Sequence, residues 1–246
     1  MHKYQILIEY VGTSFVGWQI QKNGTSIQQT IQQVLSKLLS QKVIIYGSGR
    51  TDAGVHAIEQ SAHFEVSKKI QDSTKLLKSL NFFLNKKNIS IIKIIKRNKK
   101  FHARYSAKER SYIYLIRNNQ SPSMINKNRE WHIIKKIDLI TLEKGAKKLM
   151  GTHDFSTFRA ANCNAKSPIR TINKIQIFKS KDQIKIRFKS QSFLKSQVRS
   201  MVGSLKYLGE NKWDLKKFNC IFKSRDRKRC APLAPAHGLY LEKVTY

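Results

Sequence analysis

The sequence is poor in acidic residues. Only 15 aspartates and glutamates oppose 48 lysines and arginines, which gives a formal net charge of +33 at pH 7. This excess is far beyond what solubility requires and points to a polyanionic partner, with nucleic acid as the leading candidate. Mutational drift is a competing interpretation, because the residues of AT-rich codons (Lys, Ile and Asn) crowd the sequence. Drift explains the lysines better than the arginines.

Cysteine and long apolar runs are also scarce. The three cysteines, Cys163, Cys220 and Cys230, have a spacing that fits neither a CxxC metal site nor a disulfide framework. We therefore expect reduced thiols in a cytoplasmic protein without a metal. No uncharged apolar run approaches the ~20 residues needed to span a bilayer, so we expect no membrane or secretory segment.

Hydrophobic periodicity predicts an alternation of strands and helices. In the first part of the chain, Ser26 is expected to cap a helix whose apolar face begins at Ile27. A second helix is predicted at 74–84, and strands are predicted at 3–10, 43–46, 60–66 and 88–96. The second part predicts helices at 137–150 and 194–208 and strands at 111–117, 171–179, 183–190 and 239–245. No GxGxxG fingerprint is present, which favours an α+β fold with helices on one face of a sheet.

These elements divide into two α+β halves of similar size. We expect a boundary within 101–108 and assign residues 1–104 to the first half and 105–246 to the second. The Asn- and Lys-rich segments 117–129 and 159–170 are predicted to be long surface loops, and loops of that length are often functional.

The segment GSGRTDAGVH, Gly47 to His56, is the strongest candidate for a site. It lacks the lysine that a phosphate-binding P-loop requires. One interpretation is a structural turn in which Gly54 takes a positive φ and Asp52 caps a neighbouring amide. Another is that Arg50 and Asp52 lie on the same side of an extended segment, where an arginine within ~4–6 Å holds a carboxylate ionised. Such a carboxylate can act as a nucleophile, a base or an electrostatic stabiliser.

The same segment, taken with several others, resembles the tRNA pseudouridine synthase A family. The motifs occur in the family's order and extend from the first predicted strand to the last. Besides GSGRTDAGVH they are FVGWQ (Phe15–Gln19), QSAHF (Gln60–Phe64), FHARYSAKERSYIY (Phe101–Tyr114), GTHDFSTFR (Gly151–Arg159), FLKSQVRSMVGSL (Phe193–Leu205) and APAHGLYL (Ala234–Leu241).

The resemblance implies the pseudouridine synthase fold, in which two α+β halves with mainly antiparallel sheets meet at a central cleft and carry helices on the outer face. It also implies isomerisation of uridine to pseudouridine at positions 38, 39 and 40 in the anticodon stem-loop of tRNA, by a homodimer without metal or organic cofactor. Asp52 matches the catalytic aspartate of the family. It would attack the sugar or base covalently or remove the C2′ proton, and the sequence leaves both routes open.

Further site residues follow from the same motifs. Arg199 matches the VR of the FLxxxVR block, so it is expected to be a second cation beside Asp52. Tyr112 matches the active-site tyrosine, and Tyr114 is expected to pack. The alternation of basic and aromatic side chains after residue 100 suits RNA, so we predict further RNA contacts at Phe101, His102, Arg104 and Arg110. His56, His63 and His153 are expected to be structural.

The chain departs from the family pattern at two places. NFFLNKKNISI stands where the family usually has NxxLPxD, so the proline and the aspartate of that turn are missing. Gln197 stands where the family typically has methionine. Both departures lie beside the predicted catalytic positions and bear on local packing rather than on the reaction.

Overall fold

The computed structural model describes all residues from Met1 to Tyr246, and they form two compact units. The first consists of Met1–Lys108 and Tyr240–Tyr246, and the second of Glu109–Leu239. The sequence-based division assigned the last residues to the second half. They belong to the first unit because β10 (Leu239–Thr245) pairs in parallel with β3 (His56–Val66). A pairing between segments so distant in the chain leaves no local signal in the sequence.

The sheet of the first unit has the order β4–β1–β3–β10. Strand β1 (His2–Tyr10) pairs antiparallel with both β3 and β4 (Ile89–Arg97), and the short β2 (Ile45–Gly47) pairs antiparallel with β3. Alternate residues of β1 point to opposite faces, and the inward ones, Ile6 and Ile8, are completely buried. β2 is the strand that leads into the GSGRTDAGVH segment.

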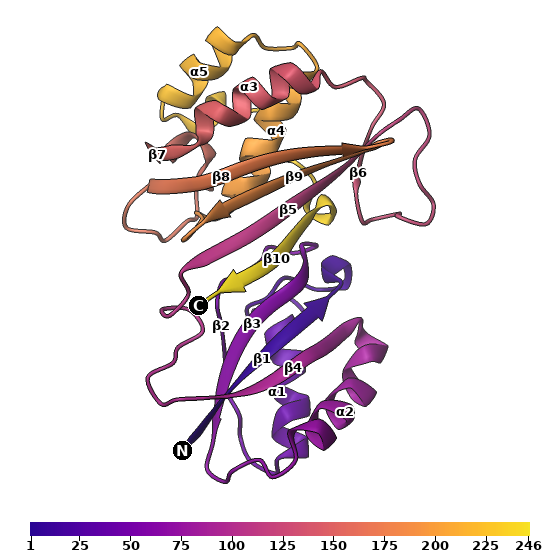
Figure 1. Ribbon diagram of the computed structural model, residues 1–246, viewed down its shortest axis with the longest axis vertical. Helices are drawn as coiled ribbons and strands as arrows, with labels where there is room; N and C mark the ends of the chain where they lie inside the picture. Colours follow the sequence, from indigo (N-terminus) through magenta and orange to yellow (C-terminus); the bar gives the residue numbers. More distant parts are fainter. The chain divides into compact units, whose positions relative to one another are not determined.

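Two helices of this unit pack beside its strands, α1 (Ile27–Leu38) and α2 (Ser73–Leu84) (Figure 1). The Ser26 hydroxyl caps α1 as predicted, because its Oγ accepts a hydrogen bond of 3.2 Å from Gln29 N. α2 is capped by Asp72, whose Oδ1 accepts from Thr74 N and Lys75 N. Both helices present one apolar stripe to the core, as the periodicity of their sequences predicts.

The missing proline and aspartate of the NxxLPxD pattern are accommodated where α2 leads into β4. Asn88 adopts a left-handed conformation, with φ of 57°, which an asparagine tolerates well. The side chain of Asn81 bonds to both the N–H and the C=O of Ile91, at 2.7 and 3.0 Å. The connection therefore keeps a defined geometry without the usual turn residues.

The sheet of the second unit has the order β5–β9–β8–β7. Its strands are β5 (Glu109–Asn118), β9 (Gln183–Ser190), β8 (Ile169–Ser180) and β7 (Gly151–Asp154), all antiparallel to their neighbours, while β6 (Trp131–Ile133) runs parallel to β5. The core on this sheet contains the fully buried side chains of Tyr114, Ile186 and Phe188.

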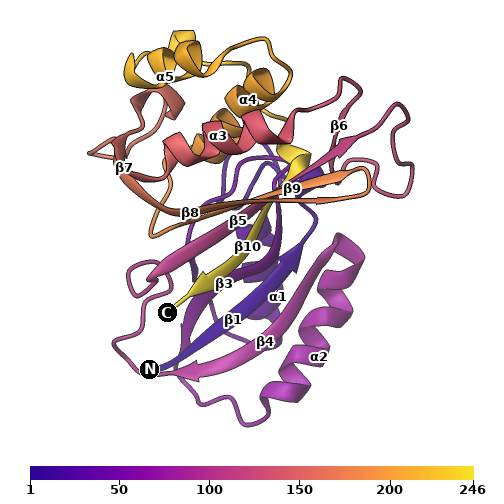
Figure 2. The same ribbon diagram turned by 45° about the horizontal axis from the view of Figure 1, so that its top comes forward.

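The helices of the second unit are α3 (Leu139–Leu149), α4 (Gln197–Gly209) and α5 (Leu215–Lys223), which contact one another on one side of its strands (Figure 2). The helix predicted from residue 194 begins at Gln197 because Ser196 has φ of 58°. The buried amide of Gln197 accepts a hydrogen bond of 2.8 Å from Leu194 N. Glutamine in place of the family's methionine thus satisfies an amide ahead of the helix.

Five short 3-10 helices complete the chain, at Gly12–Ser14, Asn85–Lys87, Ser156–Phe158, Arg227–Arg229 and Ala236–Gly238. The mixed helices and strands, with mostly antiparallel pairing, confirm the predicted α+β class. None of the helices has the length and apolar character that crossing a membrane requires.

Candidate active site

The GSGRTDAGVH segment leaves β2 and turns sharply at Asp52–Gly54. Val55 N donates a hydrogen bond of 3.2 Å to the carbonyl oxygen of Asp52, and Gly54 has φ of +78°. A positive φ at this position favours glycine, which has no Cβ to clash. The predicted glycine turn is confirmed, and it sets Asp52 at the entry of the turn.

Hydrogen bonds from other elements fix the residues around Asp52. The Tyr10 hydroxyl lies 2.8 Å from Thr51 Oγ1, and Trp18 N donates to Thr51 O at 3.1 Å. On the other side, Gln60 Nε2 donates to Gly49 O at 3.0 Å and Gln60 Oε1 accepts from the Ser48 hydroxyl at 2.7 Å. The backbone next to Asp52 is therefore held from β1, from the loop after it and from β3.

Close backbone approaches tighten this support further. A Cβ at Gly12 would clash with the carbonyl of Val55, and a Cβ at Gly17 would lie 2.7 Å from Thr51 O. Gly17 also has φ of +111°. These two glycines let the loop after β1 press against the turn, which limits its movement.

Arg50 and Asp52 flank a residue that faces the interior. Thr51 is buried and bonded to Tyr10, whereas Arg50 is exposed and Asp52 is half-buried. Burial thus alternates over these three residues, and the shared side for the guanidinium of Arg50 and the carboxylate of Asp52 stays a prediction.

Two histidines of the motifs have structural contacts. His56 Nδ1 accepts from Gly12 N at 3.1 Å, and its ring stacks on Tyr240 at 4.7 Å between centroids. His153 Nε2 lies 2.7 Å from the carbonyl oxygen of Met150. These contacts agree with the structural roles expected for both side chains.

The residues predicted from FHARYSAKER differ in their exposure. Phe101 is buried, and its ring lies 4.9 Å from the centroid of Tyr246. His102 is half-buried and Arg104 is exposed, with the Arg104 guanidinium 5.6 Å from the centre of the exposed Tyr105 ring. Phe101 thus occupies a packing position, and the charged and exposed groups lie around it.

In the second unit, one face of β5 carries Arg110, Tyr112 and Tyr114, because every second residue of a strand points to the same side. Arg110 Nη1 donates to Gln191 O at 2.5 Å, and the Tyr112 ring meets Phe193 edge-on at 5.2 Å. The Tyr114 hydroxyl donates to Pro235 O at 2.8 Å, and burial raises the pKa of Tyr114 well above its usual value. Tyr114 is therefore a packing residue, as predicted.

Arg199 projects from the first turn of α4. Its Nε donates to Ala234 O at 2.8 Å, and Ala234 N donates back to Arg199 O at 3.3 Å. The guanidinium also lowers the pKa of His237, for which burial is the larger cause. Arg199 thus joins the start of α4 to the APAHGLYL segment.

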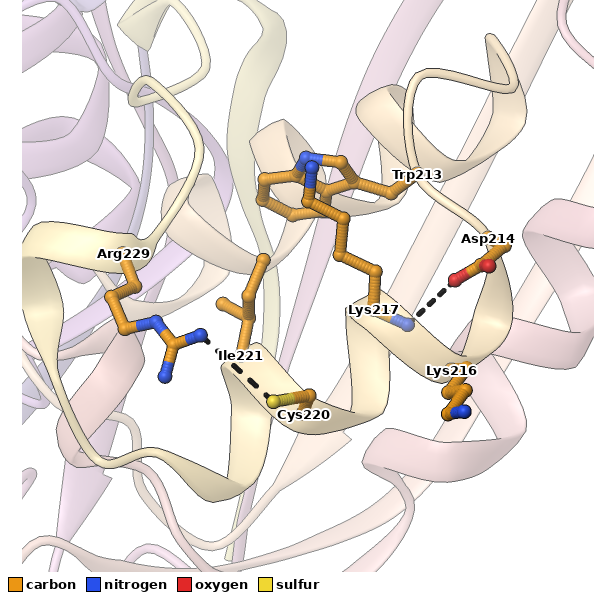
Figure 3. Close-up of a pocket in the computed structure, with 7 residues that line it drawn as sticks. All are labelled: Trp213, Asp214, Lys216, Lys217, Cys220, Ile221 and Arg229. Atoms are coloured by element: carbon orange, nitrogen blue, oxygen red, sulfur yellow. Dashed lines mark hydrogen bonds between the residues drawn. The ribbon is translucent and has the colours of Figure 1, made fainter.

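A hollow of about 550 Å³ lies on the second unit (Figure 3). It is lined by Trp213, Asp214, Lys216, Lys217, Cys220, Ile221 and Arg229. Asp214 caps α5 through Lys217 N at 2.6 Å, and Arg229 Nη2 approaches Cys220 Sγ at 3.9 Å. None of the predicted site residues lines this hollow, so its size does not mark it as the site of chemistry.

The predicted residues thus form two groups. Arg50, Asp52, Phe101, His102 and Arg104 belong to the first unit, and Arg110, Tyr112 and Arg199 belong to the second. Sequence reasoning missed the residues that support Asp52, namely Tyr10, Thr51 and Gln60. Thr51 directly precedes Asp52 in the sequence, whereas Tyr10 and Gln60 are strand residues that only the fold brings to the turn.

Comparison with known proteins agrees with the motifs. Residues 6–106 and 146–246 match the family described as tRNA pseudouridine synthase. The chain is 64% identical over its full length to the whole of tRNA pseudouridine synthase A from Pelagibacter ubique (strain HTCC1062). It is 38% identical, again over its full length, to 98% of tRNA pseudouridine synthase A from Maricaulis maris (strain MCS10).

Arg110 and Tyr112 lie between the two matched family ranges but within both full-length matches. The resemblance inferred from the motifs is confirmed by these matches. The chain therefore belongs to the tRNA pseudouridine synthase family, a family of isomerases.

Proposed function

We propose that this protein isomerises uridine to pseudouridine at positions 38, 39 and 40 in the anticodon stem-loop of tRNA. The observation that carries the proposal is the GRTDAGVH turn around Asp52, held on three sides, in a chain 64% identical throughout to a tRNA pseudouridine synthase A. A turn held in this way suits a reaction in which the attacking group must be positioned before the substrate binds.

The reaction breaks the N1–C1′ glycosidic bond, turns the detached uracil in place and joins C5 to C1′. The C5 proton then leaves and N1 gains a proton, so that the product is an isomer of the substrate. Asp52 starts the reaction, either as a nucleophile toward the sugar or base or as the base that removes the C2′ proton. The synthase must also retain the uracil, since its release would make the protein a glycosylase.

The other residues assist Asp52 in this proposal. Arg50 supplies a positive charge two residues from Asp52, and Arg199 adds a second cation that can also hold a phosphate or the ribose. The ring of Tyr112 stacks on the target uracil, and its hydroxyl is a candidate to receive the C5 proton. The target uridine has to leave its stack to reach these groups, at a cost of a few kcal/mol that phosphate contacts offset.

The partner in this proposal is the anticodon arm of tRNA, and no metal or organic cofactor takes part. We further propose that the chain works as a homodimer. A location in the cytoplasm is also proposed, and the three free cysteines fit that reducing compartment. Light scattering tests the dimer, because a dimer has twice the chain mass of 28.6 kDa.

Tritium release distinguishes the proposed reaction from its alternatives. tRNA carrying tritium at uridine C5 is incubated with the protein, and released tritium and free uracil are both measured. A synthase releases tritium and no uracil. A glycosylase releases uracil, and an RNA-binding module releases neither, so either of these two outcomes contradicts the proposal.

Asp52→Asn is expected to abolish tritium release. Its affinity for tRNA should stay within about tenfold of the wild type, which is a change of less than ~1.4 kcal/mol in binding free energy. Asp72→Asn is the matched control, because it removes the same charge from the same unit while asparagine still caps α2 well. The control is expected to keep its activity. Turnover by Asp52→Asn would exclude the carboxylate as the group that starts the reaction.

A further inference from the structure

Four rings of the first unit, those of Tyr46, His63, His102 and Tyr105, contact one another in a continuous stack. Tyr46 stacks on His63 at 5.1 Å between centroids and 23° between planes. His63 meets His102 edge-on, at 4.5 Å between centroids and 64° between planes, and His102 meets Tyr105 at 4.4 Å and 33°. The rings come from β2, β3 and the segment between β4 and β5, so the stack is a product of the fold.

The two ends of the stack are open. Tyr105 is 77% exposed and Tyr46 is 47% exposed, whereas His63 between them is 3% exposed. A tyrosine with three quarters of its surface in water contributes little to the core. The end rings are therefore available to a ligand, while the inner ring anchors them.

The two imidazoles are held in their neutral form. His63 Nδ1 accepts from Ala103 N, and His102 Nδ1 accepts from Arg104 N, both at 3.1 Å. Burial, with help from the neighbouring Lys3, lowers the pKa of both histidines, that of His63 to about 4. Near neutral pH the stack thus consists of uncharged aromatic rings in fixed positions.

A second layer supports the stack from within the unit. The Phe101 ring meets His63 edge-on at 6.1 Å, and the Arg97 guanidinium lies 4.9 Å from the centre of Phe101. The Tyr246 hydroxyl donates to Ala103 O at 2.9 Å and lies 2.6 Å from Ser61 Oγ, which can donate to it. Because these contacts order the rings before binding, a ligand would lose little entropy by stacking on them.

A cation lies at the exposed end of the stack. The Arg104 guanidinium lies 5.6 Å from the centre of the Tyr105 ring. An exposed aromatic ring beside a guanidinium is the arrangement with which proteins bind single-stranded RNA, where a base stacks and a phosphate is neutralised.

We infer that Tyr46 and Tyr105 are stacking positions for unpaired bases of the tRNA substrate, with Arg104 on the adjoining phosphate. The inference rests on the proposed function and adds a substrate-positioning site to it. Tyr46 lies four residues before Arg50, so at most about 14 Å of extended chain separates these two residues. This distance fits loop bases next to the stem that contains the target uridines.

The binding of tRNA at several salt concentrations tests the inference. Tyr105→Ala is expected to weaken binding about tenfold or more, since stacking on one base is of this size. The slope of log affinity against log salt should not change, because no phosphate contact is lost. Arg104→Ala should instead lower the slope by about one. Tyr105→Trp, which keeps a stacking ring, should retain the affinity.

Phe82→Ala is the matched control. Phe82 is also an exposed aromatic side chain of the first unit, at 65%, with the Lys86 ammonium 5.3 Å from its ring, but its ring contact is with Phe83 alone. Its loss is expected to leave tRNA affinity unchanged. An affinity of Tyr105→Ala equal to that of the wild type, or an equal loss in Phe82→Ala, would overturn the inference.

Tritium release by the wild-type protein separates this inference from the proposed function. If tritium is released but Tyr105→Ala and Tyr46→Ala bind tRNA like the wild type, the stacking site is wrong and the synthase activity stands. If the wild type releases no tritium, the proposed function fails, and the stacking site fails with it as a site for that substrate.

Discussion

At the scale of single residues, the few carboxylates of this chain have defined tasks. Four of the seven aspartates cap helices: Asp72, Asp138, Asp214 and Asp226. Two more combine a hydrogen bond with an ion pair, Asp154 with Ser156 N and Arg225, and Asp182 with Asn119 and Arg117. The seventh, Asp52, caps no helix and lies in the turn after β2. In a chain of charge +33, a half-buried carboxylate at that position opposes RNA binding, which favours a chemical role for it.

His63 is expected to make folding stability depend on pH. Burial, the neighbouring imidazole of His102 and the Lys3 ammonium lower its pKa from 6.5 to about 4, against a smaller opposing effect of Glu65. The unfolded chain therefore takes up this proton at a higher pH than the folded chain. The contribution of His63 is fully present above about pH 6.5 and is lost between about pH 6.5 and 4, by roughly 3 kcal/mol at most.

Urea unfolding at pH 7.5 and pH 4.5 measures this effect, with His63→Asn as the comparison. The variant has no titrating group at this position, so its free energy of unfolding should fall less between the two pH values than that of the wild type. The same fall in both proteins would show that His63 does not titrate in this way.

At the scale of elements, one glycine in α3 and one in α4 allow close contact with neighbouring segments. Gly203 in α4 lies so close to Pro232 that an added Cβ would clash with its carbonyl oxygen. Gly145 in α3 faces the ends of the Leu208 and Leu205 side chains, which can rotate away. Helix propensity favours alanine at both positions by about 1 kcal/mol. Only at Gly203 is the obstacle a part of the backbone.

Gly203→Ala is therefore expected to destabilise the protein by about 1–2 kcal/mol, because overpacking outweighs the gain in propensity. Gly145→Ala, the matched control, is expected to change stability by less than about 1 kcal/mol in either direction. Urea midpoints at an unchanged m-value compare the two variants. Equal midpoints would show that the Pro232 segment yields as easily as the leucines.

The helices and strands also show how much of the secondary structure can be predicted from the sequence. Long periodic segments such as 27–38 and 183–190 are predictable because one face of each is buried. β6 and β7 are too short to show a period, and β7 exists through its pairing with β8. α5 was missed although Asp214, Phe218 and Ile221 give a cap and an apolar spacing, because the helix spans only nine residues.

The features of the candidate site also divide into those that the local sequence predicts and those that only the fold produces. The turn at Asp52–Gly54 follows from local chemistry, because glycine permits the positive φ that the turn needs. The bonds of Thr51 to Tyr10 and of Gly49 to Gln60, and the ring stack from Tyr46 to Tyr105, join residues far apart in the chain. Such contacts depend on strand register, which a single sequence does not encode locally.

At the scale of the whole molecule, the excess of positive charge is only partly compensated within the protein. Several carboxylates lie in ion pairs with lysines, among them Glu65 with Lys3, Glu109 with Lys189 and Glu210 with Lys206. Since the sequence has 48 basic and 15 acidic residues, most of its cations have no carboxylate to pair with. A net field of this sign attracts polyanions over distances up to the Debye length.

Binding of tRNA is therefore expected to weaken steeply as salt rises. A protein that neutralises six or more phosphates loses about a thousandfold in affinity between roughly 50 and 200 mM salt, because the release of counterions from the RNA gains less entropy at high salt. Titrations of labelled tRNA across this range give the slope, and circular dichroism over the same range verifies that the fold is unchanged. If the lysines reflect codon drift at surface sites that do not touch RNA, the slope will be shallow despite the charge of +33. A flat dependence would remove electrostatics as the main source of affinity and leave the stacking contacts of Tyr46 and Tyr105 to account for it.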